Sequence, residues 1–285
     1  MKEITHNEYH KSINKTVDYI NDNLKKSINL KSLARISNIS EFHFHRLFKA
    51  FIGETIGSYI TRQRIEKSAQ IIQTSNRTLS EIAEKVGYQT SYSLSKAFKK
   101  HFGISPTAFR NIETFFSSKS TISKFKPLNL NPEIINIDKK ELVYIRIISK
   151  YGSEKDYDVA WGKLIEFGKE QNIISPKTEY IGLSFDNPNI TKSDKCRFYA
   201  CISSDKIIEP YSEFGLKTIK KGKFAVFKLK GCYSELNNLY HSIYFDWLPN
   251  STFKLRDNIP FEKYLNNPNK VNASEILTEI FIPIN

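Results

Sequence analysis

The sequence of 285 residues contains no long hydrophobic run. A membrane-spanning helix needs about 20 consecutive apolar residues, and no stretch approaches that length. The first residues, MKEITHNEYHKS, also lack the apolar core of a secretion signal. These absences predict a globular, cytoplasmic protein that does not act in a membrane.

Cysteine is scarce. Cys196, Cys201 and Cys232 are odd in number and show no CxxC spacing, so the sequence predicts neither a disulfide framework nor a zinc site. We expect buried or inert thiols. The sequence also lacks a nucleophile elbow, a phosphate-binding loop and a cluster of metal ligands. We therefore expect no cofactor, no metal and no catalytic residues.

Acidic residues are too few to balance the basic ones, which leaves a formal net charge of +13. Residues 1–115 carry 18 Lys and Arg against 10 Asp and Glu, whereas residues 116–285 carry 25 against 20. The excess per residue is greater in the first part. A basic chain favours polyanionic partners, although charge alone is weak evidence for them.

The stretch FHFHRLFKAF, residues 42–51, predicts an amphipathic helix. Phe44, Leu47, Phe48 and Phe51 have the spacing of one helical stripe, while Phe42, His45, Arg46 and Lys49 form another that points away. Ser40 and Gly53 are the expected N-cap and C-cap. Residues two apart on a helix diverge, so His43 and His45 cannot share one metal ion.

The same pattern recurs 50 residues later in YSLSKAFKKHFG. There Leu94, Ala97 and Phe98 repeat the apolar stripe, and the outward stripe is repeated by Tyr92, Ser95, Lys96 and Lys99. Each copy follows a shorter apolar helix and a tight turn. This is the helix-turn-helix pattern, in which the second helix enters the DNA major groove.

Residues 58–73, between the two copies, have no Gly or Pro and predict a long, rigid helix. Such a connector would fix the two reading helices relative to each other. Two helices about one DNA turn apart, roughly 34 Å, reach adjacent major grooves on one face of the duplex. One chain could therefore contact two grooves as a monomer.

Most of residues 28–110, including the closing FGISPTAFR, resembles the double helix-turn-helix domain of the AraC/XylS family of transcriptional regulators. Leu94 departs from the usual Phe but stays apolar. The resemblance implies double-stranded DNA as a partner, with RNA polymerase as a further one. It also implies base-edge contacts at the outward positions, namely Phe42, His45, Arg46, Ser91, Tyr92, Ser95 and Lys96. Lys49, Lys99 and Lys100 are better suited to phosphates, which position the protein without specifying a sequence.

After a Ser/Lys/Pro-rich linker, residues 116–132, the periodicity changes. We predict strands at 141–149, 179–185, 196–203, 222–231, 261–266 and 275–284, and helices at 156–171 and 233–249. The order β-α-β-β thus occurs twice, about 80 residues apart. Paired repeats of this kind can meet across a pseudo-twofold axis and leave a cleft for a small molecule.

Residues 133–284 resemble the GyrI-like effector-binding domain through AWGKL, FAVFKLKGCYSEL, WLPNS and FEKYLNNP, with the domain order of Rob-type regulators. In that family the glutamate of an E-x-Y segment meets cationic or polar ligands among aromatic rings. The resemblance makes this residue Glu262, with Tyr264 on the same strand face. Our candidate ring partners are Trp161, Phe185 and Trp247. A carboxylate among rings attracts lipophilic cations.

The sequence thus predicts a multi-domain protein. An all-α double helix-turn-helix domain (1–115) is followed by a linker and an α+β, GyrI-like domain of two β-α-β-β repeats (133–285). We expect a sequence-specific regulator that senses a small amphipathic or cationic effector. Two alternatives stay open: a GyrI-like hydrolase of strained electrophilic compounds, with Glu262 as general base and Tyr264 as proton partner, and an architectural DNA-binding protein.

Overall fold

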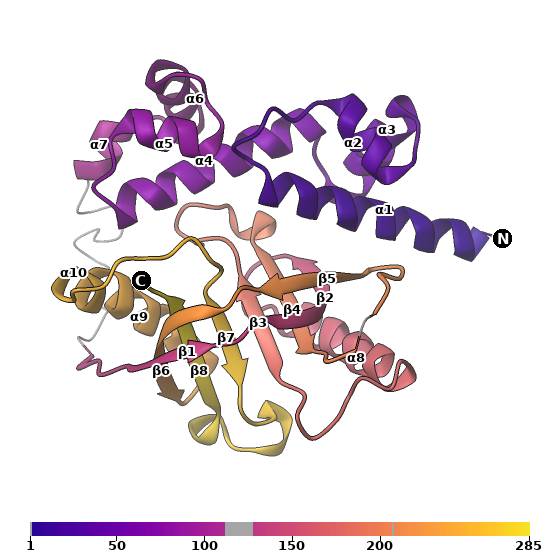
Figure 1. Ribbon diagram of the computed structural model, residues 1–285, viewed down its shortest axis with the longest axis vertical. Coiled ribbons are helices and arrows are strands. Elements are labelled where there is room, and N and C mark those ends of the chain that lie inside the picture. Colours follow the sequence, from indigo (N-terminus) through magenta and orange to yellow (C-terminus); the bar gives the residue numbers. More distant parts are fainter. Residues whose placement is uncertain (1, 112–127, 207) are drawn as a thin grey trace. The chain divides into compact units, whose positions relative to one another are not determined.

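The computed structural model describes residues 2–111, 128–206 and 208–285, with the side chains of residues 2–5 left out (Figure 1). The chain divides into two compact units. One comprises residues 1–118 with the segment Tyr211–Glu213, and the other residues 119–210 and 214–285. Most of the predicted linker, residues 116–132, lies outside the described residues.

The first unit is helical. Its helices are α1 (Lys2–Asp22), α2 (Leu30–Ser37), α3 (Glu41–Ile52), α4 (Ile56–Thr74), α5 (Leu79–Val86), α6 (Ser91–Phe102) and α7 (Pro106–Asn111). We did not predict α1, which is largely polar but buries Ile13, Val17 and Ile20 along one stripe. Together α2 and α3 form one helix-turn-helix, and α5 and α6 form the other.

Local chemistry sets the ends of these helices. The side chain of Asn29 accepts a hydrogen bond from Ser32 N at the start of α2, and Thr78 forms a capping box with Glu81 at the start of α5. Ser40 stands at the N-cap of α3 as predicted, but its side chain makes no capping bond. The expected C-cap Gly53 has φ 77°, a left-handed conformation that glycine adopts without strain.

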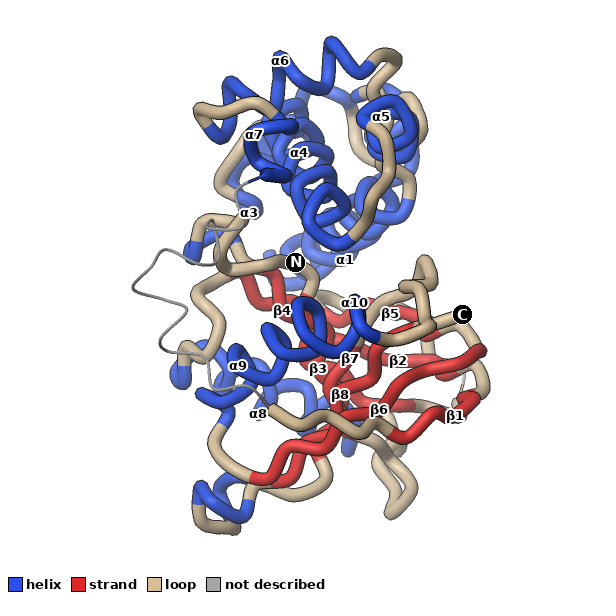
Figure 2. Tube along the Cα trace, turned by 90° about the vertical axis from the view of Figure 1, so that its left-hand side faces the viewer, coloured by secondary structure: helices blue, strands red, loops and turns tan. Residues whose placement is uncertain are grey.

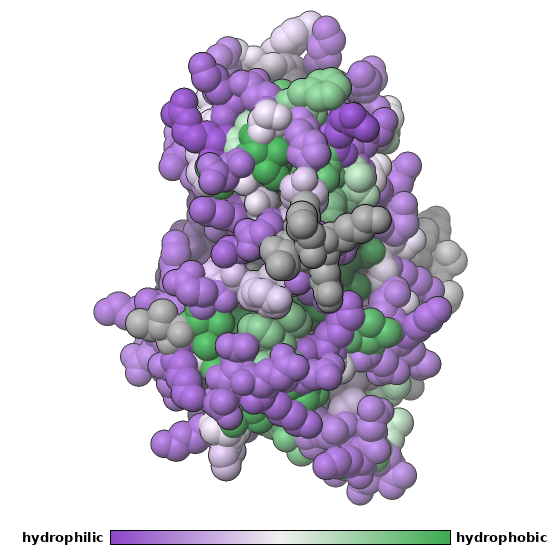
Figure 3. Space-filling model, turned by 90° about the vertical axis from the view of Figure 1, so that its right-hand side faces the viewer, coloured by the Kyte–Doolittle hydropathy of each residue, from purple (hydrophilic) through white to green (hydrophobic). Residues whose placement is uncertain are grey.

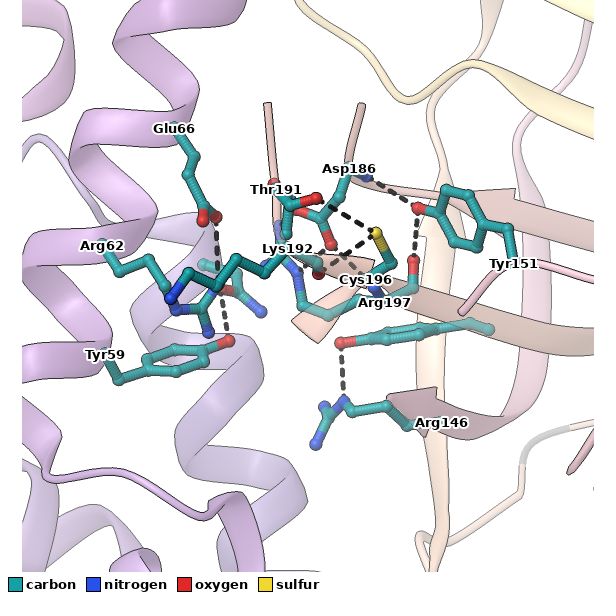
Figure 4. Close-up of polar contacts among 12 residues, drawn as sticks. Tyr59, Arg62, Glu66, Arg146, Tyr151, Asp186, Thr191, Lys192, Cys196 and Arg197 are labelled. Atoms are coloured by element: carbon teal, nitrogen blue, oxygen red, sulfur yellow. Dashed lines mark hydrogen bonds and ion pairs between the residues drawn. The ribbon is translucent and has the colours of Figure 1, made fainter. Parts of the chain in front are cut away.

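The connecting helix α4 runs from Ile56 to Thr74, slightly longer than the predicted 58–73. Its apolar residues Ile65, Ala69 and Ile72 are buried. Arg62 forms ion pairs with Glu54 at 2.6 Å and, one turn on, with Glu66 at 2.9 Å; Arg62 and Glu66 are drawn in Figure 4. These mostly buried pairs tie α4 to the loop that precedes it.

The second unit is built on one eight-stranded antiparallel sheet of order β1-β6-β8-β7-β3-β4-β2-β5. The strands, red in Figure 2, are β1 (Glu133–Ile137), β2 (Lys140–Ile148), β3 (Tyr180–Ser184), β4 (Arg197–Ser203), β5 (Phe214–Ile219), β6 (Gly222–Lys230), β7 (Phe261–Tyr264) and β8 (Leu277–Pro283). The predicted β-α-β-β order is found twice, as β2-α8-β3-β4 and as β6-α9-β7-β8. We missed β1 and β5, the two edge strands.

The two halves meet where β3 pairs with β7, in the middle of the sheet. Each edge strand precedes one repeat in sequence but pairs with the other. Strand β1 precedes β2 and pairs with β6, whereas β5 precedes β6 and pairs with β2. The sheet is therefore a pseudo-symmetric arrangement closed by a reciprocal exchange of edge strands.

The helices of this unit cover one face of the sheet. Helix α8 (Glu154–Glu170) packs on the first half around Leu164 and Phe167. On the second half, α9 (Leu236–His241) packs around Leu239 and continues as a π-helical turn, Ser242–Trp247, and then α10 (Leu248–Asn250). The other face carries a separate apolar core that includes Tyr144, Tyr199 and Phe261.

A buried ion pair fixes the loop that follows β3. The guanidinium of Arg197 donates to both carboxylate oxygens of Asp186, at 2.8 and 2.6 Å. Tyr151 completes the arrangement, because its hydroxyl accepts from Asp186 N and donates to Arg197 O (Figure 4). This network holds the end of β3 in a defined position.

None of the described helices combines the length and apolar character that crossing a membrane requires. Figure 3 shows hydrophilic side chains over most of the face that it draws, with hydrophobic side chains in smaller groups between them.

Candidate functional site

The outward stripes of α3 and α6 expose two large aromatic side chains at equivalent positions. Phe42 is 76% exposed and Tyr92 is 77% exposed. The next outward positions on each helix are also accessible, with His45, Arg46, Lys49, Lys96, Lys99 and Lys100 exposed and Ser91 and Ser95 half-buried. An exposed aromatic ring is unfavourable in water. Two such rings at equivalent positions therefore indicate a surface that contacts a partner.

The inward stripes match as well. Phe44 and Leu94 are both fully buried, and so are Phe48 and Phe98, the residues one turn further on. Leu94 thus occupies the core position of its counterpart, which agrees with the sequence prediction. Two residues of the predicted stripe of α3, Leu47 and Phe51, are only half-buried, and Ile52 next to Phe51 is buried.

The histidines of α3 do not form a metal site. Both are exposed, and the ring of His43 lies beside another ring, 5.3 Å from that of Tyr9 on α1. Phe51 likewise contacts His10 of α1, at 4.6 Å between ring centroids. Among the described residues no group of three or more His, Cys, Asp or Glu could hold a metal ion.

The positive charges of the two outward stripes are not neutralised within the unit. Across the described part of the chain, no carboxylate forms an ion pair with Arg46, Lys49, Lys96, Lys99 or Lys100. The guanidinium of Arg46 lies 5.8 Å from the ring centroid of Phe42, one helical turn away. These cations are therefore available to an external anion such as a phosphate.

In the second unit, Glu262 of β7 is the centre of a polar cluster on the helix-covered face of the sheet. Its side chain is buried and accepts hydrogen bonds from three hydroxyl groups, those of Tyr264 at 2.6 Å, Tyr240 at 3.0 Å and Ser184 at 3.4 Å. Tyr264 lies on the same strand, Tyr240 on α9 and Ser184 on β3. The cluster thus gathers residues from both halves of the sheet.

Burial governs the electrostatics of this cluster. Loss of hydration raises the pKa of Glu262, and the three hydroxyl donors only partly oppose that rise. Burial and the adjacent carboxylate together raise the pKa of Tyr240 and of Tyr264 well above the ordinary value. The same two causes raise the pKa of Tyr233 to about 12. A raised pKa keeps the phenol groups of Tyr240 and Tyr264 as donors to the Glu262 carboxylate.

The cluster depends on a glycine. Gly182 of β3 is directly opposite Glu262 in the sheet, and a Cβ atom there would collide with the hydroxyl of Tyr264 and with the ring of Phe198. The missing side chain gives the Tyr264 hydroxyl its place beside the carboxylate. This is a close approach that glycine alone allows.

The predicted ring partners have different locations. The ring of Trp161 contacts that of Tyr264 edge-on, at 5.8 Å between centroids, so the fold brings Trp161 into the cluster. Phe185 does not join it, because odd-numbered residues of β3 face the other side of the sheet, where Phe185 packs against Tyr199. Trp247 packs against Phe227 and Phe253 in the core under α9.

Sequence reasoning missed four members of the cluster. Ser184 and Tyr240 bind Glu262 directly, while Tyr233 packs 5.6 Å from Tyr264 and Tyr157 stacks on Phe198 at 4.5 Å. The seven-residue spacing of Tyr233 and Tyr240 was the available signal, since it corresponds to one helical face.

The cysteines differ from one another. Cys196 and Cys201 are buried free thiols, as expected, but Cys232 is exposed. Hydrogen bonding by Ser234 lowers the pKa of the Cys232 thiol. Burial is therefore the wrong expectation for Cys232, and its inertness stays a prediction.

Comparisons with known proteins match both domains of the chain. Residues 130–285 match the model of the GyrI-like small molecule binding domain, and residues 33–112 match a helix-turn-helix domain. The F1 operon positive regulatory protein of Yersinia pestis is 26% identical over 287 residues, which cover 96% of this chain and 88% of that protein.

Two further similarities cover one domain each. The uncharacterized HTH-type transcriptional regulator YbfP of Bacillus subtilis is 29% identical over 111 residues, or 39% of this chain and 38% of that protein. The crystal structure of the EcmrR C-terminal domain covers 55% of this chain and 99% of its own, with 19% identity and a TM-score of 0.45. The match over residues 130–285 shows that the chain belongs to the GyrI-like family of small molecule binding domains. This domain is joined here to an AraC-type helix-turn-helix domain, and the chain is a DNA-binding transcriptional regulator of the AraC/XylS family.

Proposed function

We propose that the two outward stripes of α3 and α6 read an asymmetric operator. Arg46 can donate two hydrogen bonds to guanine, and Phe42 can contact a thymine methyl group. The matching burial of the two helices supports this proposal, because it points equivalent residues of both helices outward. Lys49, Lys99 and Lys100 then hold the phosphate backbone.

We further propose that the effector is an amphipathic cation held at Glu262. One observation carries this proposal: the buried carboxylate is surrounded by hydroxyl groups and rings, and neither Lys nor Arg forms an ion pair with it within the described residues. Burying a carboxylate is costly unless a cation compensates it. A ligand that brings a positive charge and apolar surface would supply both the charge and the ring contacts.

We infer that the second domain binds its ligand without transforming it. Both carboxylate oxygens of Glu262 already accept hydrogen bonds from hydroxyl groups, an arrangement suited to holding a charge. We expect an electrophilic probe to remain chemically intact after long incubation with the protein.

We also propose the partners that the sequence predicts. The chain binds DNA as a monomer in the cytoplasm, contacts RNA polymerase and needs no cofactor. Sedimentation of the protein with and without a single operator duplex tests the monomer. Transcription from that operator with purified polymerase tests the polymerase contact.

The central experiment has two stages. Selection of random duplexes by the purified protein identifies the operator, and a thermal-shift screen of lipophilic cations then compares the wild type with Glu262→Gln. We expect a defined operator and a cation that stabilises the wild type more than the variant. Weak sequence preference would favour the architectural alternative, and equal stabilisation of both proteins would remove the role of Glu262.

A further inference from the structure

A second buried polar group lies close to the Glu262 cluster. Thr278 of β8 is 1% exposed, and its hydroxyl oxygen has no hydrogen-bond partner among the described residues. A buried hydroxyl without a partner destabilises the folded protein, because it loses its bonds to water and gains none in return. Such a group therefore requires an explanation.

The sheet register places Thr278 on the ligand side. Thr278 is directly opposite Tyr264, and Glu262 is directly opposite Ile280, which is two residues further along β8. Residues opposite each other in an antiparallel pair share a face, and diagonal neighbours lie roughly 7–8 Å apart. Thr278 and Glu262 are thus diagonal neighbours on the helix-covered face.

Aromatic rings lie on the same face of the sheet as these two groups. Tyr264 stands between Trp161 and Tyr233, with centroid distances of 5.8 and 5.6 Å. The face therefore offers a carboxylate, aromatic walls and one hydroxyl that can donate or accept a hydrogen bond.

We propose that Thr278 determines specificity at the effector site, by forming a hydrogen bond with a neutral polar group of the ligand. The inference rests on the proposed function of Glu262 and narrows the class of ligand. The effector is an amphipathic cation that carries a hydroxyl, carbonyl or ether oxygen a few bonds from its charged centre. Purely hydrocarbon cations satisfy Glu262 and leave Thr278 without a partner.

Another threonine offers a matched control. Thr191 is 2% exposed, and its hydroxyl likewise lacks a partner among the described residues, but it lies in the loop after β3, beside Asp186 and Cys196 (Figure 4). Thr191→Val removes the same group as Thr278→Val and keeps the shape of the side chain. Only one of the two substitutions alters the ligand face.

The test uses two probes that differ by one hydroxymethyl group, benzyltrimethylammonium and benzyl(2-hydroxyethyl)dimethylammonium. Calorimetric titration gives the dissociation constant of each for the wild type, Thr278→Val, Thr191→Val and Glu262→Gln. We expect the wild type to bind the hydroxylated probe about three- to tenfold more tightly, as one net hydrogen bond provides. Thr278→Val should abolish that ratio without changing the affinity for benzyltrimethylammonium, and Thr191→Val should preserve it.

Thermal unfolding of the ligand-free variants keeps the result interpretable. Thr278→Val removes an unpartnered hydroxyl, so its midpoint should equal or exceed that of the wild type. If Thr278→Val keeps the ratio of the two dissociation constants, or weakens the binding of both probes equally, the role of Thr278 is overturned and that of Glu262 is not. Failure of both probes to bind the wild type, or unchanged binding in Glu262→Gln, overturns the proposed function and this inference with it.

Discussion

The two units hold their functional side chains in opposite ways. The helical unit exposes Phe42, Tyr92 and the basic residues near them, whereas the sheet unit buries Glu262 beneath α9. Exposed side chains contribute little to the stability of a fold, so changing them should alter binding alone. A buried carboxylate affects stability and binding together. The same experiment should therefore give different results in the two units.

The largest expected effect is a difference in stability between substitutions on the two faces of α3. Phe48→Ala empties a fully buried position and should lower the free energy of unfolding of the helical unit by about 3–5 kcal/mol. Phe42→Ala should change it by less than about 0.5 kcal/mol, because the ring is exposed. Urea unfolding followed by circular dichroism measures both. Equal losses in the two variants would contradict the division of α3 into a core face and a binding face.

The stability of the sheet unit should depend on pH through the carboxyl group of Glu262. Because burial raises its pKa in the folded protein, the folded state keeps a proton that the unfolded state releases above the ordinary value of 4.5. Stability should therefore fall as pH rises from 4.5 to the raised pKa, and stay constant above it. In Glu262→Gln this change of stability with pH should be absent. The variant should also unfold at a higher temperature than the wild type near neutral pH.

Cation binding should show the opposite dependence on pH. A bound cation favours the charged carboxylate, so the affinity of benzyltrimethylammonium should increase as pH rises through the raised pKa of Glu262. The gain should be absent in Glu262→Gln. An affinity that is independent of pH in the wild type would mean that the cation binds elsewhere.

A smaller effect is expected for a base contact. Arg46→Ala should weaken operator binding by about 1–3 kcal/mol and relax the preference at one base pair, since a bidentate contact to guanine is lost. Competition with operators that vary at each position identifies that base pair. A uniform loss on all duplexes would assign Arg46 to the phosphates instead.

The smallest effect is expected for a phosphate contact. Lys99→Ala should weaken specific and random DNA alike and reduce the slope of log affinity against log salt by about 1. Titrations at several salt concentrations give the slope. Stability serves as the control, because Lys99 is exposed and makes no ion pair within the described part of the chain.

The sequence predicted the helical unit more completely than the sheet unit, for physical reasons. Helical periodicity is local, so the 50-residue repeat revealed both the buried Phe44 and Leu94 and the exposed Phe42 and Tyr92. The helix α1 escaped prediction because its few apolar residues lie within a mostly polar sequence. Which DNA contacts these positions make stays a prediction.

Pairing in a sheet joins residues that are distant in sequence, and its register cannot be deduced from the sequence of either strand alone. The E-x-Y spacing put Glu262 and Tyr264 on one face, but only the β3–β7 register reveals that Ser184 faces them and Phe185 does not. The location of Trp247 could not be predicted for another reason. The π-helical turn Ser242–Trp247 departs from the 3.6-residue period, so a phase counted from α9 does not apply to that ring.

The exchange of β1 and β5 makes the halves of the sheet unit interdependent. A fragment that ends after β4 would keep the pairing of β2 with β4 but leave β1 without its partner β6, β2 without its partner β5 and β3 without its partner β7. Unpaired strands recruit other chains, so two copies of such a fragment would complete each other. An ancestral dimer of single repeats is the assembly that this strand exchange would preserve within one chain.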